Sequence, residues 1–176
     1  MVNKPTDKKK HIFYIDRDYF DGRHIDDVSV NELTTNQGYQ NFVKIRNELK
    51  KRFDLSSWAK GLDEGIISFL DIKSSQGINY DCLITHLPFS NSPVSTKFGR
   101  GQYYTKFYEP ALGILRNLRA ARKELPIIAY TGGDVNYIED LLLAPDIAIS
   151  AIIQKSGKTE EDLREIKSHL ARLLNR

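Results

Sequence analysis

Short runs of apolar, β-prone residues recur along this chain, separated by longer segments with a helical pattern. Each run is too short for a typical buried helix and is bounded by polar or turn-forming residues, so each is typical of a buried strand. The runs cover residues 11–15, 53–59, 80–87, 126–130 and 147–153. Pro88 ends the third run, since proline cannot donate to a strand ladder. The pattern therefore predicts five strands.

Between and after these runs, apolar residues recur at spacings of three and four, which predicts amphipathic helices. A short helix is also expected over residues 135–143. The last helix begins at Thr159, where three acidic residues in the first turn favour the positive end of the helix dipole. The predicted buried stripes are Phe42, Ile45, Leu49 and Phe53; Leu62, Ile66, Phe69 and Leu70; Leu112, Leu115, Leu118 and Ala121; and Leu163, Ile166, Leu170 and Leu173 or Leu174.

Strands that alternate with helices need crossover connections, which produce a parallel sheet covered by helices on both faces. The expected fold is therefore an α/β doubly wound five-stranded parallel sheet. We expect one domain over residues 11–176, preceded by a flexible basic tail at 1–10. Two long polar segments, 17–36 and 89–105, are predicted to be loops inserted after the first and third strands. In such folds ligands bind at the carboxyl ends of the strands.

Composition narrows the class of protein further. Of 176 residues, 40% are hydrophobic and 28% are charged, which is typical of a globular domain with a sizeable core. The one cysteine, Cys82, lies in an apolar run and is interpreted as a small buried hydrophobe. With no apolar segment near the N-terminus, we expect a cytoplasmic protein without membrane contact. A net charge of +3 is small for a nucleic-acid-binding surface, so no such partner is expected.

Polar residues stand at the predicted carboxyl ends of four strands. Asp16 and Arg17 follow the first strand, His86 ends the third, Thr131 ends the fourth and Lys155 ends the fifth. The order and spacing of these segments resemble the receiver domain of two-component response regulators. The similarity covers residues 110–131 for the third helix and fourth strand of that family, 53–70 for its second strand and helix, 80–84 for its third strand and 152–155 for its fifth. The resemblance implies a sheet order of 2-1-3-4-5.

A working receiver, as the resemblance implies, has two acidic residues after the first strand for Mg²⁺ and an aspartate ending the third strand to accept phosphate. This chain keeps Asp16, Thr131 and Lys155 at the matching positions, but has Arg17 in place of the second carboxylate and His86 in place of the phosphate acceptor. The usual switch aromatic and the proline after the lysine are replaced as well, by Ile152 and Ser156. We therefore interpret the chain as a degenerate receiver that is not an enzyme and needs no metal or cofactor. Alternatively, Asp18 would supply the missing carboxylate if the loop shifted by one residue.

Several roles for these residues stay open. Asp16 and Lys155 are expected to form an ion pair that needs no metal. His86 is either a neutral hydrogen-bonded side chain or, alternatively, a phosphohistidine or a pH switch, because imidazole titrates near neutrality. Arg17, His86, Thr131 and Lys155 could instead form a cationic cup, which would make the protein a sensor of an anionic small ligand or nucleotide.

The predicted function is phosphorylation-independent signalling through protein–protein contact. Aromatic and arginine side chains are favoured interface anchors. The candidate partner-binding residues are Phe98, Arg100, Tyr103, Tyr104 and Tyr137. Packing of these rings onto the domain itself is the other interpretation. The expected partner is a signalling kinase, an output protein or a second copy of the chain.

Overall fold

The computed structural model describes residues 9–16, 37–58, 79–87, 109–132 and 139–175. Its five strands are all parallel and lie in the order β2-β1-β3-β4-β5, so the predicted fold class is confirmed. The strands are β1 (His11–Ile15), β2 (Asp54–Trp58), β3 (Cys82–Thr85), β4 (Ile127–Thr131) and β5 (Ala151–Gln154). The helices are α2 (Gln37–Lys50), α6 (Glu109–Ala121), α7 (Glu139–Leu143) and α8 (Thr159–Leu174).

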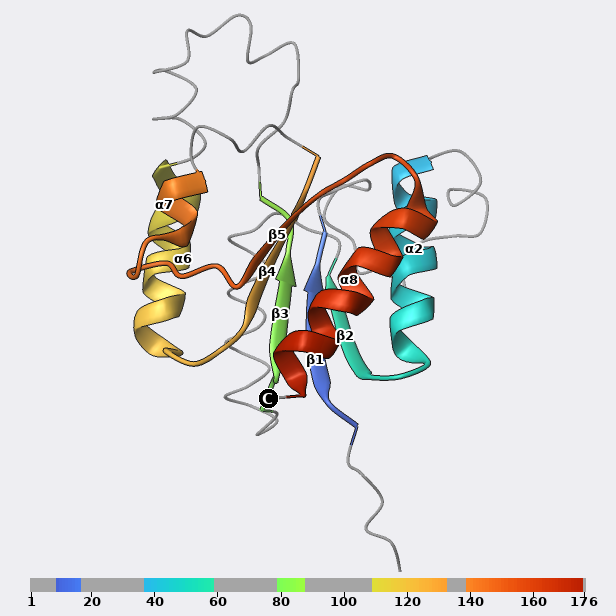
Figure 1. Ribbon diagram of the computed structural model, residues 1–176, viewed down its shortest axis with the longest axis horizontal. Helices are drawn as coiled ribbons and strands as arrows, with labels where there is room; N and C mark the ends of the chain where they lie inside the picture. Colours follow the sequence, from blue (N-terminus) through green and yellow to red (C-terminus); the bar gives the residue numbers. More distant parts are fainter. Residues whose placement is uncertain (1–8, 17–36, 59–78, 88–108, 133–138, 176) are drawn as a thin grey trace, which may run out of the picture.

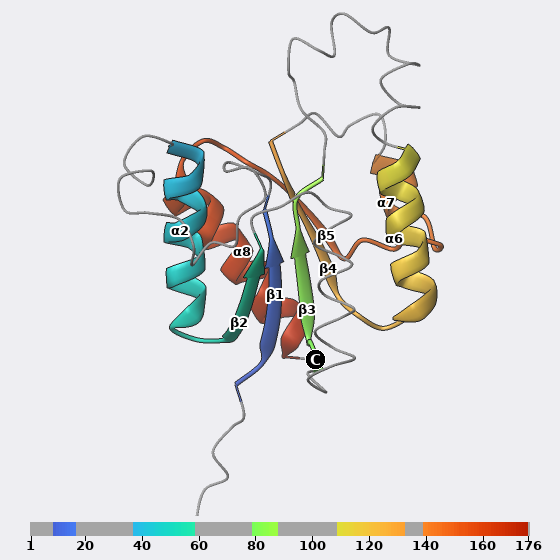
Figure 2. The ribbon, with the colours of Figure 1, turned by 180° about the vertical axis from the view of Figure 1, so that it is seen from behind.

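The helices cover both faces of the sheet, as predicted. Helices α2 and α8 lie side by side on one face, while α6 and α7 lie on the other (Figures 1 and 2). No helix within the described ranges is long and apolar enough to span a bilayer.

Alternate residues of β1, β3 and β4 supply the two core clusters, because successive side chains of a strand point to opposite faces. Phe13 and Ile15 of β1 face α6 and α7, whereas Ile12 and Tyr14 face α2 and α8. The predicted stripes of α2, α6 and α8 supply further members of both clusters, but Ala121 is exposed, and Phe53, Leu173 and Leu174 are only partly buried. The buried members include Phe42, Ile45 and Leu49 of α2, Leu112, Leu115 and Leu118 of α6, and Leu163, Ile166 and Leu170 of α8.

The predicted fifth strand is wrong in its first half, because the strand begins at Ala151 and not at residue 147. Ile147 and Ile149 are buried as an apolar pattern suggests, but the backbone there is not extended: Ala148 has a φ of 48°. The carbonyl oxygens of Ile147 and Ala148 accept hydrogen bonds from Arg119, and the amide of Ile149 donates to Leu142. These tertiary contacts replace the strand ladder.

Other predicted elements differ by a few residues or lie outside the described residues. Strands β2, β3 and β4 fall inside or within one residue of their predicted ranges, and the short helix is described only as α7. The predicted helix over 62–70 and the loops 17–36 and 89–105 are outside the described residues, as are positions 1–8 of the predicted tail.

Cys82 is fully buried in β3, as its apolar neighbours predicted. Burial, with a smaller contribution from Asp81, raises the pKa of this thiol to about 12. Only about one thiol in ten thousand is then ionised at pH 8, and the thiolate is the reactive form. We expect Cys82 to react with a chromogenic disulfide reagent only at the rate of unfolding, and to react at once in guanidinium chloride. Rapid reaction of the folded protein would contradict the buried position.

Candidate functional site

A buried ion pair joins the ends of β1 and β5 at the carboxyl edge of the sheet. Lys155 Nζ lies 2.7 Å from Asp16 Oδ1, and the Asp16 side chain is only 2% exposed. The second carboxylate oxygen, Oδ2, accepts a hydrogen bond of 3.0 Å from the Tyr14 hydroxyl. Because β3 and β4 lie between β1 and β5, Lys155 must reach across two strand ends to make this contact. The ion pair predicted from the sequence is present.

The aromatic ring of Tyr130 contacts the ammonium group of Lys155. Lys155 Nζ lies 4.6 Å from the centre of this ring, within the range of a cation–π contact. The Lys155 amide donates a hydrogen bond of 2.7 Å to the Thr131 carbonyl, which extends the β4–β5 pairing to the site. The amide contact fixes the backbone of Lys155, and the ring contact supports its ammonium group, which also pairs with Asp16.

His86 occupies the position next to Asp16 across the β1–β3 pairing. The register pairs Ile15 with Thr85, and the His86 amide donates a hydrogen bond of 2.9 Å to the Ile15 carbonyl. The His86 side chain is buried. Where the resemblance implies a phosphate-accepting carboxylate, the structure therefore holds a buried imidazole at the end of β3.

Thr131 ends β4 and is fully buried. Its hydroxyl faces the Leu87 carbonyl oxygen at 3.4 Å. Of the four residues of the predicted cationic cup, three are thus brought to one edge, with the charge of Lys155 already balanced by Asp16. Arg17 lies outside the described residues. The cup remains a prediction, which thermal denaturation in the presence of inorganic phosphate would test.

The described donors at this edge do not fit a divalent ion. Mg²⁺ takes oxygen ligands and usually one or more carboxylates. Here the carboxylate of Asp16 is bound by the Lys155 ammonium, and the neighbouring position holds an imidazole. Within the ranges that the structure describes, no group of three or more acidic, histidine or cysteine side chains could hold a metal ion.

A second buried carboxylate, Asp162, was missed by the sequence interpretation, which treated it only as part of the acidic first turn of α8. It is 3% exposed and accepts three hydrogen bonds: from the Tyr130 hydroxyl at 2.7 Å, the Ser156 hydroxyl at 2.7 Å and the Ser156 amide at 2.9 Å. The helical spacing could have predicted this burial, because Asp162 adjoins Leu163 and lies four residues before Ile166 on the buried stripe. Asp162 thereby ties the segment after Lys155 to β4.

Among the candidate partner-binding residues, Phe98, Arg100, Tyr103, Tyr104 and Tyr137 all lie outside the described residues. Asp18 does as well. Their predicted roles therefore stay predictions.

The sequence matches no protein-family model and no curated protein. Solved structures do match. The phosphorylated cyanobacterial phytochrome response regulator RcpA has a TM-score of 0.56 and 11% identity, covering 95% of each chain. The signal receiver domain of an HD domain-containing protein from Pseudomonas fluorescens has a TM-score of 0.54 and 12% identity, over 96% of this chain and 100% of that one. A CheY-like receiver domain protein from Methanospirillum hungatei has a TM-score of 0.52 and 13% identity, over 96% and 98%.

The chain has the receiver fold. The strand order and the placement of helices agree with the resemblance seen in the sequence. At such low identities the likeness concerns the fold, and the chemistry must be argued from the residues of this chain. On this receiver fold, the edge that carries Asp16, His86, Thr131 and Lys155 holds a lysine–aspartate ion pair and an imidazole.

Proposed function

We propose that this protein is a degenerate receiver that signals by protein–protein contact and does not depend on phosphorylation. It acts as a binding module and catalyses no reaction. The receiver fold supports a role in signal transduction, and the residues at the carboxyl edge support independence from phosphate.

The ion pair between Lys155 and Asp16 carries the proposal. In a site that depends on Mg²⁺, a carboxylate must be available to the metal, and an aspartate must be present to form the acyl phosphate. Here the Asp16 carboxylate is held by Lys155 at 2.7 Å and by the Tyr14 hydroxyl at 3.0 Å, so its charge is balanced without a ligand. His86 cannot form an acyl phosphate because it has no carboxyl group.

The contacts around Asp162 support a single conformation of the segment between β5 and α8. The Asp162 carboxylate accepts hydrogen bonds from the amide and the hydroxyl of Ser156. It also accepts one from the Tyr130 hydroxyl, and the ring of Tyr130 makes the cation–π contact with Lys155. Charged hydrogen bonds of a buried carboxylate are among the stronger ones in proteins. The segment between β5 and α8 is therefore held in place by contacts at both of its ends. This conformation needs no phosphoryl group.

We propose the face formed by α7, β5 and α8 as the partner surface. Leu143, at the end of α7, is the exposed large hydrophobic residue of the described structure, with 51% of its surface accessible. It is flanked by exposed polar residues of α7, which suits a surface that binds reversibly. The partner is a signalling kinase, an output protein or a second copy of the chain.

A magnesium titration tests the proposal. We expect the melting temperature of the wild-type protein to be unchanged by millimolar Mg²⁺, because its donors do not suit the ion. The variant Arg17→Asp/His86→Asp restores both missing carboxylates, and its melting temperature should rise with Mg²⁺. A magnesium-dependent rise in the wild type equal to that of the variant would overturn the proposal.

A further inference from the structure

The amino edge of the sheet, opposite the site, is strongly basic. In a parallel sheet all strands begin at one edge, so the residues that precede each strand meet there, together with the C-terminal ends of the helices. Lys9 and Lys10 precede β1, residues 50–52 precede β2, and Arg122 and Lys123 precede β4. The basic edge is the name given below to eight residues: Lys9, Lys10, Lys50, Lys51, Arg52, Arg122, Lys123 and Arg172.

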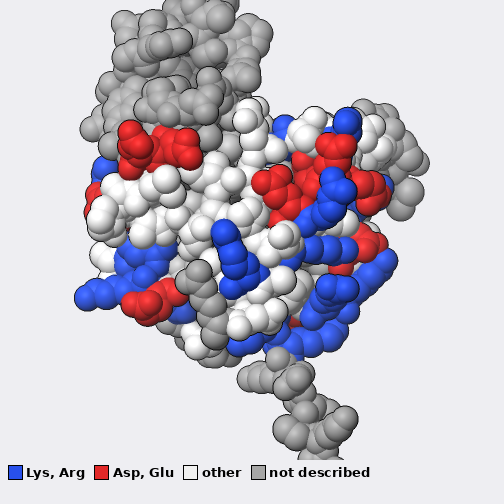
Figure 3. All heavy atoms as spheres, in the orientation of Figure 1, with Lys and Arg blue, Asp and Glu red and all other residues white. Residues whose placement is uncertain are grey.

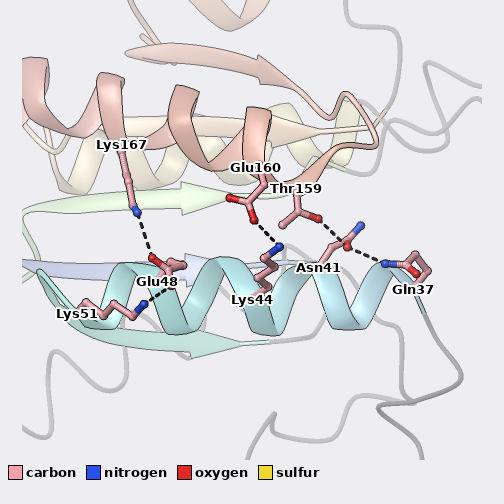
Figure 4. A network of polar contacts seen from close by, with 8 residues as sticks. All are labelled: Gln37, Asn41, Lys44, Glu48, Lys51, Thr159, Glu160 and Lys167. Atoms are coloured by element: carbon pink, nitrogen blue, oxygen red, sulfur yellow. Dashed lines mark hydrogen bonds and ion pairs between the residues drawn. The ribbon is translucent and has the colours of Figure 1, made fainter.

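These cations outnumber the carboxylates around them. Among the described residues, four carboxylates adjoin these cations, namely Asp54, Asp81, Glu124 and Glu48, which pairs with Lys51 (Figure 4). Seven of the eight basic residues are exposed, and Arg122 is partly exposed. On the face drawn in Figure 3, basic side chains gather along the lower part and acidic ones mostly near the top. On this face the charge is therefore unevenly distributed along the strands, and it is more basic toward their amino ends.

Pairing within the domain neutralises only part of this charge. Lys10 lies 3.4 Å from Asp81, and Lys51 pairs with Glu48. Lys9, Arg52 and Lys123 have no ion pair among the described residues. Cations at helix C-termini are favoured by the helix dipole, which accounts for Lys50 and Arg172. It does not account for Lys9, Arg52 and Lys123, because these three lie outside the helices.

The spacing of the basic edge suits an extended polypeptide. The positive groups follow the starts of β2, β1 and β4, and β2 and β4 are three strand spacings apart in the sheet order, or about 14 Å. An extended segment of about four to five residues covers that distance.

We propose that the basic edge binds an acidic protein segment. This goes beyond the proposed function, because it assigns a second surface, at the edge of the sheet opposite the candidate site. A polypeptide can place neutral or basic side chains opposite Asp54, Asp81 and Glu124, whereas each of these carboxylates would repel the uniformly charged backbone of a nucleic acid. Of the residues described at this edge, none is an exposed large hydrophobic side chain on which bases could stack.

Binding of a labelled peptide of alternating Glu and Gly tests the proposal by fluorescence anisotropy at about 0.1 M salt, where the Debye length is about 10 Å. A peptide with Gln for Glu, and duplex DNA, serve as comparison ligands. The variant Lys50→Glu/Arg52→Glu changes the basic edge, with Lys9→Glu/Lys123→Glu as a second variant. The matched control is Lys158→Glu/Arg164→Glu, which reverses two exposed cations at and near the start of α8.

We expect each edge variant to weaken binding of the Glu peptide about tenfold or more, and the control to weaken it by less than about threefold, because exposed charges act over roughly a Debye length. Amide chemical-shift changes should be confined to residues 9–11, 50–54 and 122–124. Equal losses in the control, equal binding of the Gln peptide, no binding at all, or tighter binding of DNA would each overturn the proposal. None of these results bears on magnesium binding, so they separate this inference from the proposed function.

Discussion

The variant Arg119→Met should lower the free energy of unfolding by about 4 kcal/mol, because it removes a charged donor and leaves several carbonyl oxygens without that hydrogen bond. Arg119 is 9% exposed and donates to five carbonyl oxygens, at distances from 2.6 to 3.1 Å. Three of these belong to the turn after α6 and two to the segment before β5. Methionine fills similar space but leaves all five without this donor. Chemical denaturation measures the loss.

Arg116→Met is the control for this experiment. Arg116 lies on the same helix, and its Nε donates to Asp146 at 2.6 Å, but both side chains are about half exposed. An exposed ion pair contributes about 0–1 kcal/mol. Equal losses in the free energy of unfolding for the two variants would contradict the view that Arg119 holds the segment before β5.

The variant Lys155→Met should lower the free energy of unfolding by about 3 kcal/mol, because it leaves the Asp16 carboxylate buried without its cation. Asp16 is 2% exposed, and the Tyr14 hydroxyl that donates to its Oδ2 carries no charge to replace that of the lysine. The loss should be the same with and without Mg²⁺, since the pair is proposed to need no metal.

The double variant Asp16→Asn/Lys155→Met should recover part of this stability. Removing both charges of a buried pair costs less than removing one, so the double-mutant cycle is expected to give a coupling of about 2 kcal/mol. Additive losses from the two single variants would mean that Asp16 and Lys155 do not stabilise each other.

Much of the fold was predictable because apolar periodicity reports burial directly. The stripes of α2, α6 and α8 each pack into one core cluster, and the apolar runs of β1, β3 and β4 supply alternate residues to both. Residues 147–150 were mistaken for strand because Ile147 and Ile149 alternate as in a strand, yet their backbone is fixed by Arg119, which is far away in sequence. A local pattern holds no information about such a donor.

The candidate site was predictable to the extent that strand ends could be located. Asp16, His86, Thr131 and Lys155 each follow or end a strand, so a correct topology brings them to one edge. Asp162 was missed for the opposite reason: its role depends on the Tyr130 hydroxyl and on Ser156, and a carboxylate in the first turn of a helix normally faces solvent. Whether a polar side chain is buried against a partner in another element depends on tertiary packing, which a local sequence pattern does not report.

Incubation with a small phosphodonor and Mg²⁺, followed by intact-mass spectrometry, tests the central claim most directly. The account predicts an unchanged mass for the wild-type protein, with Arg17→Asp/His86→Asp as the variant that regains the acceptor and the metal carboxylates. A wild-type mass increased by one phosphoryl group, placed on Asp16, Asp18 or His86 by fragmentation, would contradict it.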